Sequence, residues 1–328
     1  MIKWGIIGCG NVTEVKSGPA FNKVKNSQLV AVMRRDAALA EDYARRHKVP
    51  KFYNEASKLI NDREINAVYV ATPPGSHAEY ALATIKAGKP VYIEKPMALN
   101  YEECKLINEA AEKKSIPVFV AYYRRTLPGF LKVRELVDHG AIGNIRFVKI
   151  QLFKTLSEDE KSGILSWRVD PSVAGGGHFF DLASHQLDYL DFLFGPVQKV
   201  KSVVLNQGSL YSAEDFVSAE FLFPGNIAGT GTWCFTISPG CEKDTIEIFG
   251  EKGSIKFSTF TFDPIVLTNA SGSQEYFNER PEHVQYYLIE QVVRALDGKG
   301  HVSSTGLTAA RTSKIMDEIV CEYYQDKR

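Results

Sequence analysis

Three titratable side chains lie in one short segment, at a spacing that would let them act together in one reaction. Asp181, His185 and Asp188 would fall within about 60° of arc on a helix of 3.6 residues per turn. The apolar residues of the same segment would fall on the opposite side: Ala183, Leu187, Leu190 and Phe194. The alternative is a solvated polar face, on which Asp181 serves only as a helix N-cap.

These side-chain types suit the reduction of a carbonyl group, which needs a proton donor for the developing alkoxide. His185 is the best donor, because the pKa of an unperturbed imidazole lies nearest neutrality. Asp181 would orient substrate hydroxyls, and Asp188 is a weaker candidate behind them. The glycines at 175–177, just before the segment, allow close approach of backbone or ligand.

Lys95 is a candidate for catalysis at a different place in the chain. It stands between Glu94 and Pro96, directly after the short apolar run Val91–Ile93. Ligand crevices of α/β proteins lie at such strand ends, where an ammonium can polarise a carbonyl and stabilise an alkoxide. The alternative is a surface lysine that merely follows a strand, but its two neighbours favour a fixed turn.

A glycine-rich turn near the N-terminus indicates a dinucleotide-binding site. The segment Gly8–Thr13 reads GCGNVT, follows the strand-like run Ile2–Ile7, and differs from the GxGxxG fingerprint only at its last position. Glycine permits the tight turn and the close approach of backbone to pyrophosphate, and the last position packs helix on strand. A glycine turn without a ligand is the alternative. The residues expected to hold the cofactor here are Gly8, Gly10, Asn11 and Val12.

The residues after the second predicted strand bear on the choice of cofactor. A domain that binds NAD usually carries an acid there for the ribose 2′-hydroxyl, but this chain has Arg34 and Arg35 after Met33. Two guanidiniums suit a 2′-phosphate in charge and in geometry, so NADP(H) is preferred and NAD(H) is the second choice. In the alternatives, Asp36 is the acid with the register moved by two, or both arginines are only solvated.

The elements that must position these groups alternate between strand and helix in the first part of the chain. Apolar runs rich in β-branched residues predict strands at Ile2–Ile7, Gln28–Met33, Ala67–Ala71, Val91–Ile93 and Val118–Ala121. Helical patterns lie between them at Ala37–His47, His77–Ala87 and Tyr101–Lys114. This order predicts βαβ units and a doubly wound parallel sheet, which is a Rossmann domain over residues 1–121.

The second part, residues 122–328, has strands that follow one another with few helices. Predicted strands are Arg146–Phe153, Val200–Asn206, Val217–Phe223, Ile227–Phe235, Asp244–Phe249 and Ser254–Phe257. Predicted helices are Leu131–Asp138, Phe179–Phe194, Val284–Asp297 and Gly306–Tyr324. We expect an α+β domain with a large, mostly antiparallel sheet that binds substrate and mediates oligomerisation. An open sheet face would favour a homo-oligomer, a dimer or a tetramer.

Several motifs together resemble the Gfo/Idh/MocA family of glucose–fructose oxidoreductase and inositol dehydrogenase relatives. They are the glycine turn, ATPPGSH at 71–77, EKP at 94–96, Trp167-Arg168, the three glycines at 175–177 and DxxxHxxD at 181–188. The resemblance covers nearly the whole chain, with departures at Thr13 and Arg34. Similarity to 1,5-anhydrofructose reductases is suggestive, but the shared motifs are family-wide.

The resemblance implies further site residues. For the cofactor it implies Thr72, Pro73, His77, Glu94 and Lys95, and it places Lys95 beside both cofactor and substrate. For the substrate it implies Asp181 and His185.

Four more residues are expected to wall the substrate site. Tyr123 and Arg124 follow the last strand of the first domain, where the two domains would join. Trp167 and Arg168 are expected beside the sugar, because aromatic faces suit the C–H surfaces of a sugar ring. The alternative for the aromatic residues is an ordinary place in the core.

The composition limits the classes of partner. Lys plus Arg and Asp plus Glu are both 39, which gives no support for nucleic acid or an anionic membrane as a partner. No apolar stretch approaches the length of a membrane helix, and no secretory signal is visible. Five scattered cysteines without a CxxC motif indicate neither a disulfide framework nor a metal site, so cytoplasmic residence is expected.

The predicted function is the NADP(H)-dependent interconversion of a hydroxyl and a carbonyl on a sugar or polyol by hydride transfer. Lys95 would polarise the carbonyl, and His185 would transfer the proton. An NAD-dependent sugar or inositol dehydrogenase is the alternative enzyme. A dinucleotide-binding regulator without catalysis is the alternative of another class, and the presence of both Lys95 and His185 argues against it.

Overall fold

The computed structural model describes residues 1–325 and divides into two compact units. The first unit is Met1–Thr126 with Pro281–Ala310, and the second is Leu127–Arg280 with the residues from Arg311 onward. The sequence predicts a single boundary after residue 121, whereas residues 281–310 group with the first unit. Residues 326–328, the end of the predicted second domain, lie outside the described residues.

The sheet of the first unit has six strands in the order β3-β2-β1-β4-β5-β6, and every pair is parallel. This is the strand order of a dinucleotide-binding fold, and it confirms the predicted doubly wound parallel sheet. The strands are β1 (Ile2–Ile7), β2 (Ser27–Met33), β3 (Lys51–Tyr53), β4 (Ala67–Val70), β5 (Val91–Ile93) and β6 (Val118–Val120).

The two faces of this sheet bury different kinds of side chain. Val68 and Val70 of β4 join an aliphatic cluster with helices α4 (Ala56–Asn61), α5 (His77–Lys86) and α6 (Tyr101–Lys114). The opposite face is aromatic, and its rings lie within 4.9–6.5 Å of one another: Trp4, Phe21, Tyr69 and Tyr92. Burial on both faces explains why these strands read as continuous apolar runs.

The remaining helices of the first unit are shorter or come late in the chain. They are α1 (Asn11–Val15), α2 (Ala20–Lys23), α3 (Ala37–His47) and α11 (Tyr286–Leu296). The late segment belongs here because Gln285 bonds to Tyr92 and Glu94 at the aromatic face, at 2.9 and 2.5 Å. Ser304 also extends the edge of the sheet, since its hydroxyl donates to the carbonyl of Val120 at 2.7 Å.

The sheet of the second unit has eight strands in the order β14-β13-β12-β11-β7-β10-β9-β8. Only the central pair β7 and β10 is parallel, so the predicted mostly antiparallel sheet is confirmed. The strands are β7 (Ile145–Phe153), β8 (Lys199–Leu205), β9 (Phe216–Phe223), β10 (Ile227–Cys234), β11 (Lys243–Gly250), β12 (Gly253–Phe257), β13 (Ile265–Asn269) and β14 (Gly272–Tyr276).

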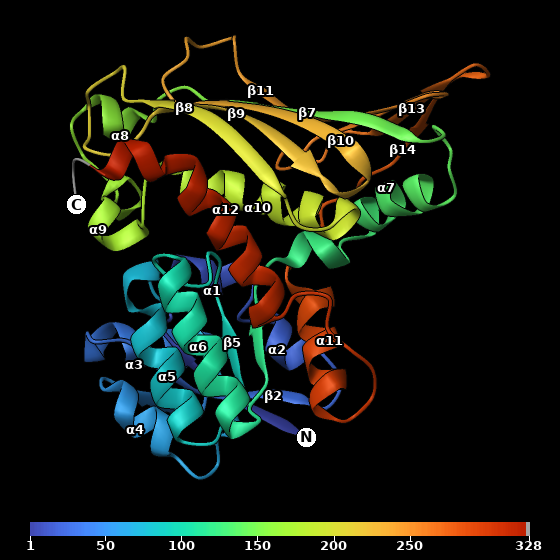
Figure 1. Ribbon diagram of the computed structural model, residues 1–328. Coiled ribbons are helices and arrows are strands. Elements are labelled where there is room, and N and C mark those ends of the chain that lie inside the picture. Colours follow the sequence, from blue (N-terminus) through green and yellow to red (C-terminus); the bar gives the residue numbers. More distant parts are fainter. Residues whose placement is uncertain (326–328) are drawn as a thin grey trace. The chain divides into compact units, whose positions relative to one another are not determined.

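Helices cover one face of this sheet, with α10 lying along it in Figure 1. The helices are α7 (Pro128–Asp138), α8 (Glu158–Lys161), α9 (Pro171–Ala174), α10 (His178–Phe194) and α12 (Gly306–Gln325), which begins in the first unit. Val148, Ile150 and Leu152 of β7 are buried, while Phe147 and Lys149, which alternate with them, are exposed. The other face of the sheet is therefore open within this unit.

Candidate functional site

The turn after β1 requires glycine at its first position. Gly8 has a φ of +92°, and a Cβ there would lie 2.7 Å from the Cγ2 and 2.8 Å from the backbone nitrogen of Thr72. The backbone N–H groups of Gly8 and Cys9 both donate to the carbonyl of Met33, at 2.9 and 3.2 Å. The turn is thus tied to the end of β2, and Thr72, which follows β4, leaves no room for a Cβ at Gly8.

The second glycine leaves open space beside the backbone. A Cβ at Gly10 would meet only the carbonyl oxygen of Gly8, at 3.9 Å, so a phosphate can approach the chain there. Thr13, which replaces the third glycine of the fingerprint, is fully buried. Its hydroxyl donates to the carbonyl of Gly10 at 2.8 Å, and its own carbonyl accepts from Tyr43 at 2.8 Å. The departure at Thr13 is accommodated, and the cradle fits a dinucleotide.

Arg34 and Arg35 are exposed directly after β2, which ends at Met33 as predicted. The Nη1 of Arg34 lies 3.5 Å from the carbonyl oxygen of Cys9, beside the glycine turn. Asp36 instead begins helix α3, where its carboxylate accepts from the backbone N–H of Leu39 at 3.1 Å. Asp36 therefore serves as an N-cap, and which residue meets the ribose stays a prediction.

His77 ties together two loops at the carboxyl end of the sheet. It is fully buried, and its two ring nitrogens lie 2.7 Å from the carbonyl oxygen of Thr72 and 3.0 Å from that of Pro96. Burial lowers the pKa of His77, although the two carbonyls oppose that shift. The ring therefore holds the loop of Thr72 and Pro73 against the loop that follows Lys95, and cofactor contact by these residues remains a prediction.

The carboxylate of Glu94 belongs to a buried hydrogen-bond network. Its Oε1 accepts from the hydroxyl of Tyr69 and from Nε2 of Gln285, both at 2.5 Å. Its Oε2 accepts from the backbone N–H of Lys95 at 3.1 Å. Burial first, and the nearby carboxylate second, hold the pKa of Tyr69 well above its usual range, so this hydroxyl stays a donor. Glu94 thus fixes the backbone at Lys95, a half-buried residue at the carboxyl end of β5.

The residues after β6 form a short 3₁₀ turn, Tyr123–Thr126, in which all four side chains are buried. The guanidinium of Arg124 lies over the ring of Tyr123, 5.1 Å from its centroid, and Arg125 donates to the carbonyl of Ser303 at 3.0 Å. The predicted roles of Tyr123 and Arg124 toward substrate remain predictions.

In the second unit, α10 carries the predicted stripe of titratable groups. The helix begins at His178 with Gly177 as its N-cap, so Asp181 lies inside it and the N-cap alternative is wrong. His185 is 4% exposed and Asp188 is fully buried, which excludes a merely solvated face for these two. The ring of His185 stands edge-on to Phe260, with centroids 6.0 Å apart.

Asp188 has a structural partner on the C-terminal helix. The hydroxyl of Thr312 lies 3.3 Å from its Oδ1. The supporting role that the sequence indicated for Asp188 stays a prediction.

Arg168 joins Trp167 to Asp181. The Nε of Arg168 pairs with the carboxylate of Asp181 at 3.1 Å. The same guanidinium lies over the ring of Trp167, 4.4 Å from its centroid, and Trp167 is 37% exposed. The ion pair fixes the Asp181 carboxylate, while the aromatic ring remains accessible within this unit.

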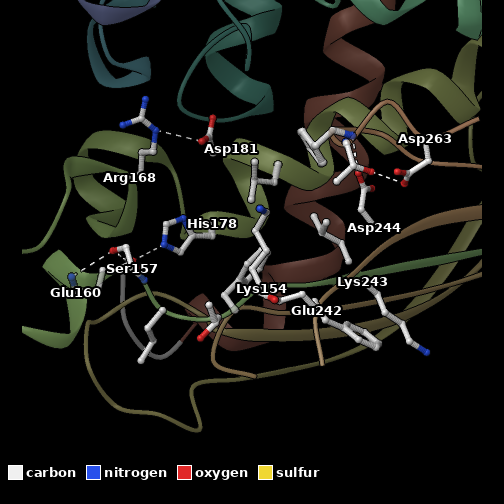
Figure 2. Close-up of a pocket in the computed structure, with 18 residues that line it drawn as sticks. Lys154, Ser157, Glu160, Arg168, His178, Asp181, Glu242, Lys243, Asp244 and Asp263 are labelled. Carbon is white, nitrogen blue, oxygen red and sulfur yellow. Dashed lines mark hydrogen bonds and ion pairs between the residues drawn. The ribbon is translucent and has the colours of Figure 1, made fainter. Parts of the chain in front are cut away.

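Asp181 lines a cavity of about 760 Å³ that lies wholly within the second unit (Figure 2). Its wall combines residues of α10, the loop after β7, the start of β11 and the loop after β12. The polar residues that line it are Lys154, Thr155, Ser157, Glu160, Arg168, His178, Asp181, Glu242, Lys243, Asp244, Thr261 and Asp263. Only Arg168 and Asp181 of this set were predicted from the sequence.

One pair in this wall had a visible sequence signal. Ser157 and Glu160 form a capping box at the start of α8, the S-x-x-E pattern that marks a helix start. Glu160 also bonds to the ring nitrogen Nε2 of His178 at 2.5 Å. Burial would raise the pKa of Glu160, but its bonds with His178 and Ser157 outweigh that effect and lower it.

Glu214 is a buried residue that the sequence did not indicate. Its Oε1 accepts from the backbone N–H of Gly177 at 2.8 Å, and its Oε2 accepts from the hydroxyl of Tyr324 at 2.5 Å. Burial raises the pKa of Glu214 to about 7, against the lowering effect of these hydrogen bonds. A Cβ at Gly177 would lie 2.6 Å from the Glu214 carbonyl oxygen, so the glycine allows this close approach at the start of α10.

Among the described residues, 1–325, no group of three or more His, Cys, Asp or Glu side chains is arranged to hold a metal ion. No helix in this part of the chain has the length and apolar character to cross a membrane.

Comparison with protein-family models identifies the class of protein. Residues 2–122 match a model described as an oxidoreductase family with an NAD-binding Rossmann fold, and residues 130–256 match the GFO/IDH/MocA C-terminal domain. The chain therefore belongs to the Gfo/Idh/MocA family of oxidoreductases, as its motifs indicated.

Individual relatives agree with this assignment. A protein named oxidoreductase P35 from Formosa agariphila is 43% identical over 318 residues, which are 96% of this chain and 97% of that protein. The trans-1,2-dihydrobenzene-1,2-diol dehydrogenase of Bos taurus is 25% identical over 277 residues, 84% of this chain and 79% of its own. A levoglucosan dehydrogenase in complex with NADH has a TM-score of 0.88 at 25% identity, over 99% of this chain and 97% of its own.

Proposed function

We propose that this protein interconverts a hydroxyl and a carbonyl on a sugar or polyol, with NADP(H) as its hydride carrier. The observation that carries the proposal is the position of Asp181, which lines a polar cavity. Asp181 belongs to helix α10, which also carries the nearly buried His185. Relatives named levoglucosan dehydrogenase and dihydrobenzenediol dehydrogenase act, by their names, on hydroxylated rings, which supports the substrate class.

The cofactor is expected at the glycine turn of the first unit. Gly8 and Gly10 offer a backbone free of Cβ atoms, and Asn11 and Val12 begin the helix that follows. When bound, the nicotinamide of the cofactor supplies or accepts the hydride.

Arg34 and Arg35 support NADP(H) over NAD(H). Both side chains are exposed at the end of β2, where a 2′-phosphate would be recognised, and Asp36 is engaged as an N-cap. The levoglucosan dehydrogenase structure contains NADH, so an NAD-dependent sugar dehydrogenase is the alternative. A direct comparison of the two cofactors distinguishes these possibilities.

Lys95 is proposed to stabilise negative charge on the reacting oxygen. In the reducing direction, hydride addition to the carbonyl carbon leaves an alkoxide, and an ammonium beside that oxygen lowers the barrier. The bond from its backbone N–H to Glu94 limits the positions that the Lys95 main chain can adopt. Such fixed placement is what makes a charge effective in the transition state.

His185 is proposed to transfer the proton, and Asp181 to bind a neighbouring hydroxyl. In reduction, the imidazolium donates its proton to the alkoxide, and in oxidation the neutral ring takes the proton of the hydroxyl. The pair of Arg168 with Asp181 holds this carboxylate in one orientation, so that the substrate hydroxyl meets a fixed acceptor.

A panel of sugars and ketosugars with NADPH and with NADH, followed at the nicotinamide absorbance, tests the proposal. We expect turnover of at least one sugar or polyol, with the better rate from the NADP(H) pair. A folded protein that binds the cofactor but turns over none of the panel would support the alternative of a non-catalytic regulator.

The open face of the eight-stranded sheet supports a homo-oligomer. Its exposed apolar side chains include Phe147, stacked on Phe249 with centroids 4.3 Å apart, and Val203 and Leu205 of β8. We propose a dimer through this face. Light scattering of the parent and of Val203→Lys should show a dimer and a monomer, and a monomeric parent would contradict the proposal.

A further inference from the structure

The cavity of the second unit is lined by residues of α10 that precede His185, the residue proposed to transfer the proton. His178 and Asp181 line it, while its lining, drawn from the described residues, does not include His185. His178 precedes His185 by seven residues on α10, which is about 10 Å along a helix axis. That distance is longer than one sugar ring.

Two phenylalanines that line the cavity contact the rings of His185 and His178. Phe260 lies against the ring of His185, with centroids 6.0 Å apart, and Phe235 lies against the ring of His178 at 5.4 Å. Both line the cavity, so it extends from the neighbourhood of His185 to that of His178. Aromatic rings at both ends suit the apolar C–H faces of sugar rings.

The size of the cavity exceeds what one reacting ring needs. Its volume is about 760 Å³, in the upper part of the roughly 300–1,000 Å³ range of small-molecule pockets. If the reacting carbon of the substrate lies beside His185, the part of the cavity beyond Asp181 remains for another group of that substrate.

Two carboxylates of the wall have different parts. Asp244 accepts four hydrogen bonds from the backbone N–H groups of Thr259, Phe260 and Thr261, at 2.5–3.1 Å; these use its acceptor sites and fix the loop after β12. Asp263, on that loop, is oriented by the hydroxyl of Thr261, which donates to it at 2.5 Å. Oxygens that are already oriented pay little further entropy to accept a ligand hydroxyl.

Lys154 adds a donor that points into the cavity. It follows β7 directly, and Figure 2 shows its side chain directed toward α10. The wall thus contains two lysines and an arginine among several carboxylates. Such a mixture of both signs matches a neutral ligand with many hydroxyls better than an ion of either charge.

We propose that this cavity binds a second, neutral sugar unit, so that the substrate is a glycoside or a short oligosaccharide. This inference rests on the proposed function for the reacting ring. Lys154 and the far carboxylates then select the second unit by hydrogen bonds, and the free monosaccharide is a poor substrate because it leaves this part of the cavity to water.

The test compares matched pairs of sugars on the holoenzyme with NADP⁺ and with NAD⁺: glucose with cellobiose, galactose with lactose, mannose with mannobiose and xylose with xylobiose. We expect kcat/KM to be at least tenfold higher for the disaccharide of the preferred pair. Lys154→Ala should lower the ratio of disaccharide to monosaccharide kcat/KM about tenfold, as expected for the loss of a charged hydrogen bond. Equal use of both sugars, or a ratio that Lys154→Ala leaves unchanged, would overturn the proposal.

Lys161→Ala is the matched control, because this exposed lysine of α8 pairs with Glu158 and lies outside the cavity. It should leave the ratio unchanged. If no sugar of the panel is turned over, the proposed function fails. Calorimetric titration with the four disaccharides then still tests whether the cavity binds a second sugar unit. Binding that Lys154→Ala weakens would support the second sugar unit, and no binding of any disaccharide would overturn it.

Discussion

The carboxylate of Glu94 accepts the backbone N–H of Lys95 at 3.1 Å with one oxygen, and two buried donors with the other. The residue proposed to stabilise the reacting oxygen is therefore held by a neighbour in sequence that is itself anchored in the core of the first unit. The position of Lys95 depends on residues as distant in the chain as Gln285.

Glu94→Gln should weaken both the fold and the reaction. Whichever way the new amide points, its NH₂ faces a donor, so we expect the free energy of unfolding to fall by about 1–3 kcal/mol. We also expect kcat to fall about tenfold, because in either orientation the network that fixes the Lys95 backbone is disturbed. Urea denaturation and steady-state rates measure the two effects. Tyr69→Phe is the control, since it should reduce stability and keep kcat, and an equal loss of kcat in both variants would contradict the positioning role.

Lys95→Ala should lower kcat roughly 100- to 1,000-fold, which is the scale for removing one donor to a transition-state oxyanion. Cofactor affinity and melting temperature should stay near those of the parent. Lys95→Arg should rescue the rate poorly, because a planar fork does not replace a compact ammonium. Rates near the parental value in a folded variant would remove Lys95 from the mechanism.

His185→Ala should lower turnover by about 100-fold or more if this ring transfers the proton. Titration with NADPH should show nearly unchanged affinity, because the residue belongs to the second unit and the glycine turn to the first. His139→Ala, at an exposed histidine after α7, is the control and should behave as the parent. Turnover within a few-fold of the parent would show that another group moves the proton.

Arg34→Asp should weaken NADPH binding at least tenfold and narrow or reverse the preference over NADH, because a carboxylate repels the 2′-phosphate and suits a ribose hydroxyl. Fluorescence titration with both cofactors measures the effect. Arg63→Asp, at an exposed arginine of the same unit, controls for the change in net charge. Equal or tighter binding of NADH by the parent would contradict the proposed preference for NADP(H).

Stability should decline as the pH rises toward neutrality, because burial raises the pKa of Glu214 from 4.5 to about 7. Between those values the folded state holds a proton that the unfolded state releases, so the free energy of unfolding falls with pH, by on the order of 3 kcal/mol. Below pH 4.5 and above pH 7 this contribution is constant. Glu214→Gln should show a flatter profile in denaturation at pH 5 and pH 8, and parallel profiles would contradict the assignment.

Much of the fold could be predicted because its elements have strong local patterns. Helices α3 and α6 and strands β1 and β5 have the predicted bounds, since each carries a clear periodicity or a buried apolar run. The strand Lys51–Tyr53 was missed because it has only three residues, none of them buried. The hairpin of β13 and β14 was missed because its second strand, GSQEY, is polar and mostly exposed.

The candidate site was predictable only where its residues stand in one segment. The stripe of Asp181 and His185 is a local pattern, and helical geometry alone brings its members together. Glu214 and Tyr324 meet across 110 residues of sequence, and no local spacing indicates such a contact. The same holds for Lys154, whose place in the cavity follows from the sheet and the loops around it.

The discontinuity of both units has a consequence for biosynthesis. Domains usually fold as they emerge during translation, the N-terminal one first. Here the aromatic face of the first unit gains Gln285, and the buried Glu214 of the second gains Tyr324, only when the last stretch of the chain has been made. The first unit cannot reach its final packing before Gln285 has been made, nor the second before Tyr324, so we expect both to mature late in synthesis and close together in time.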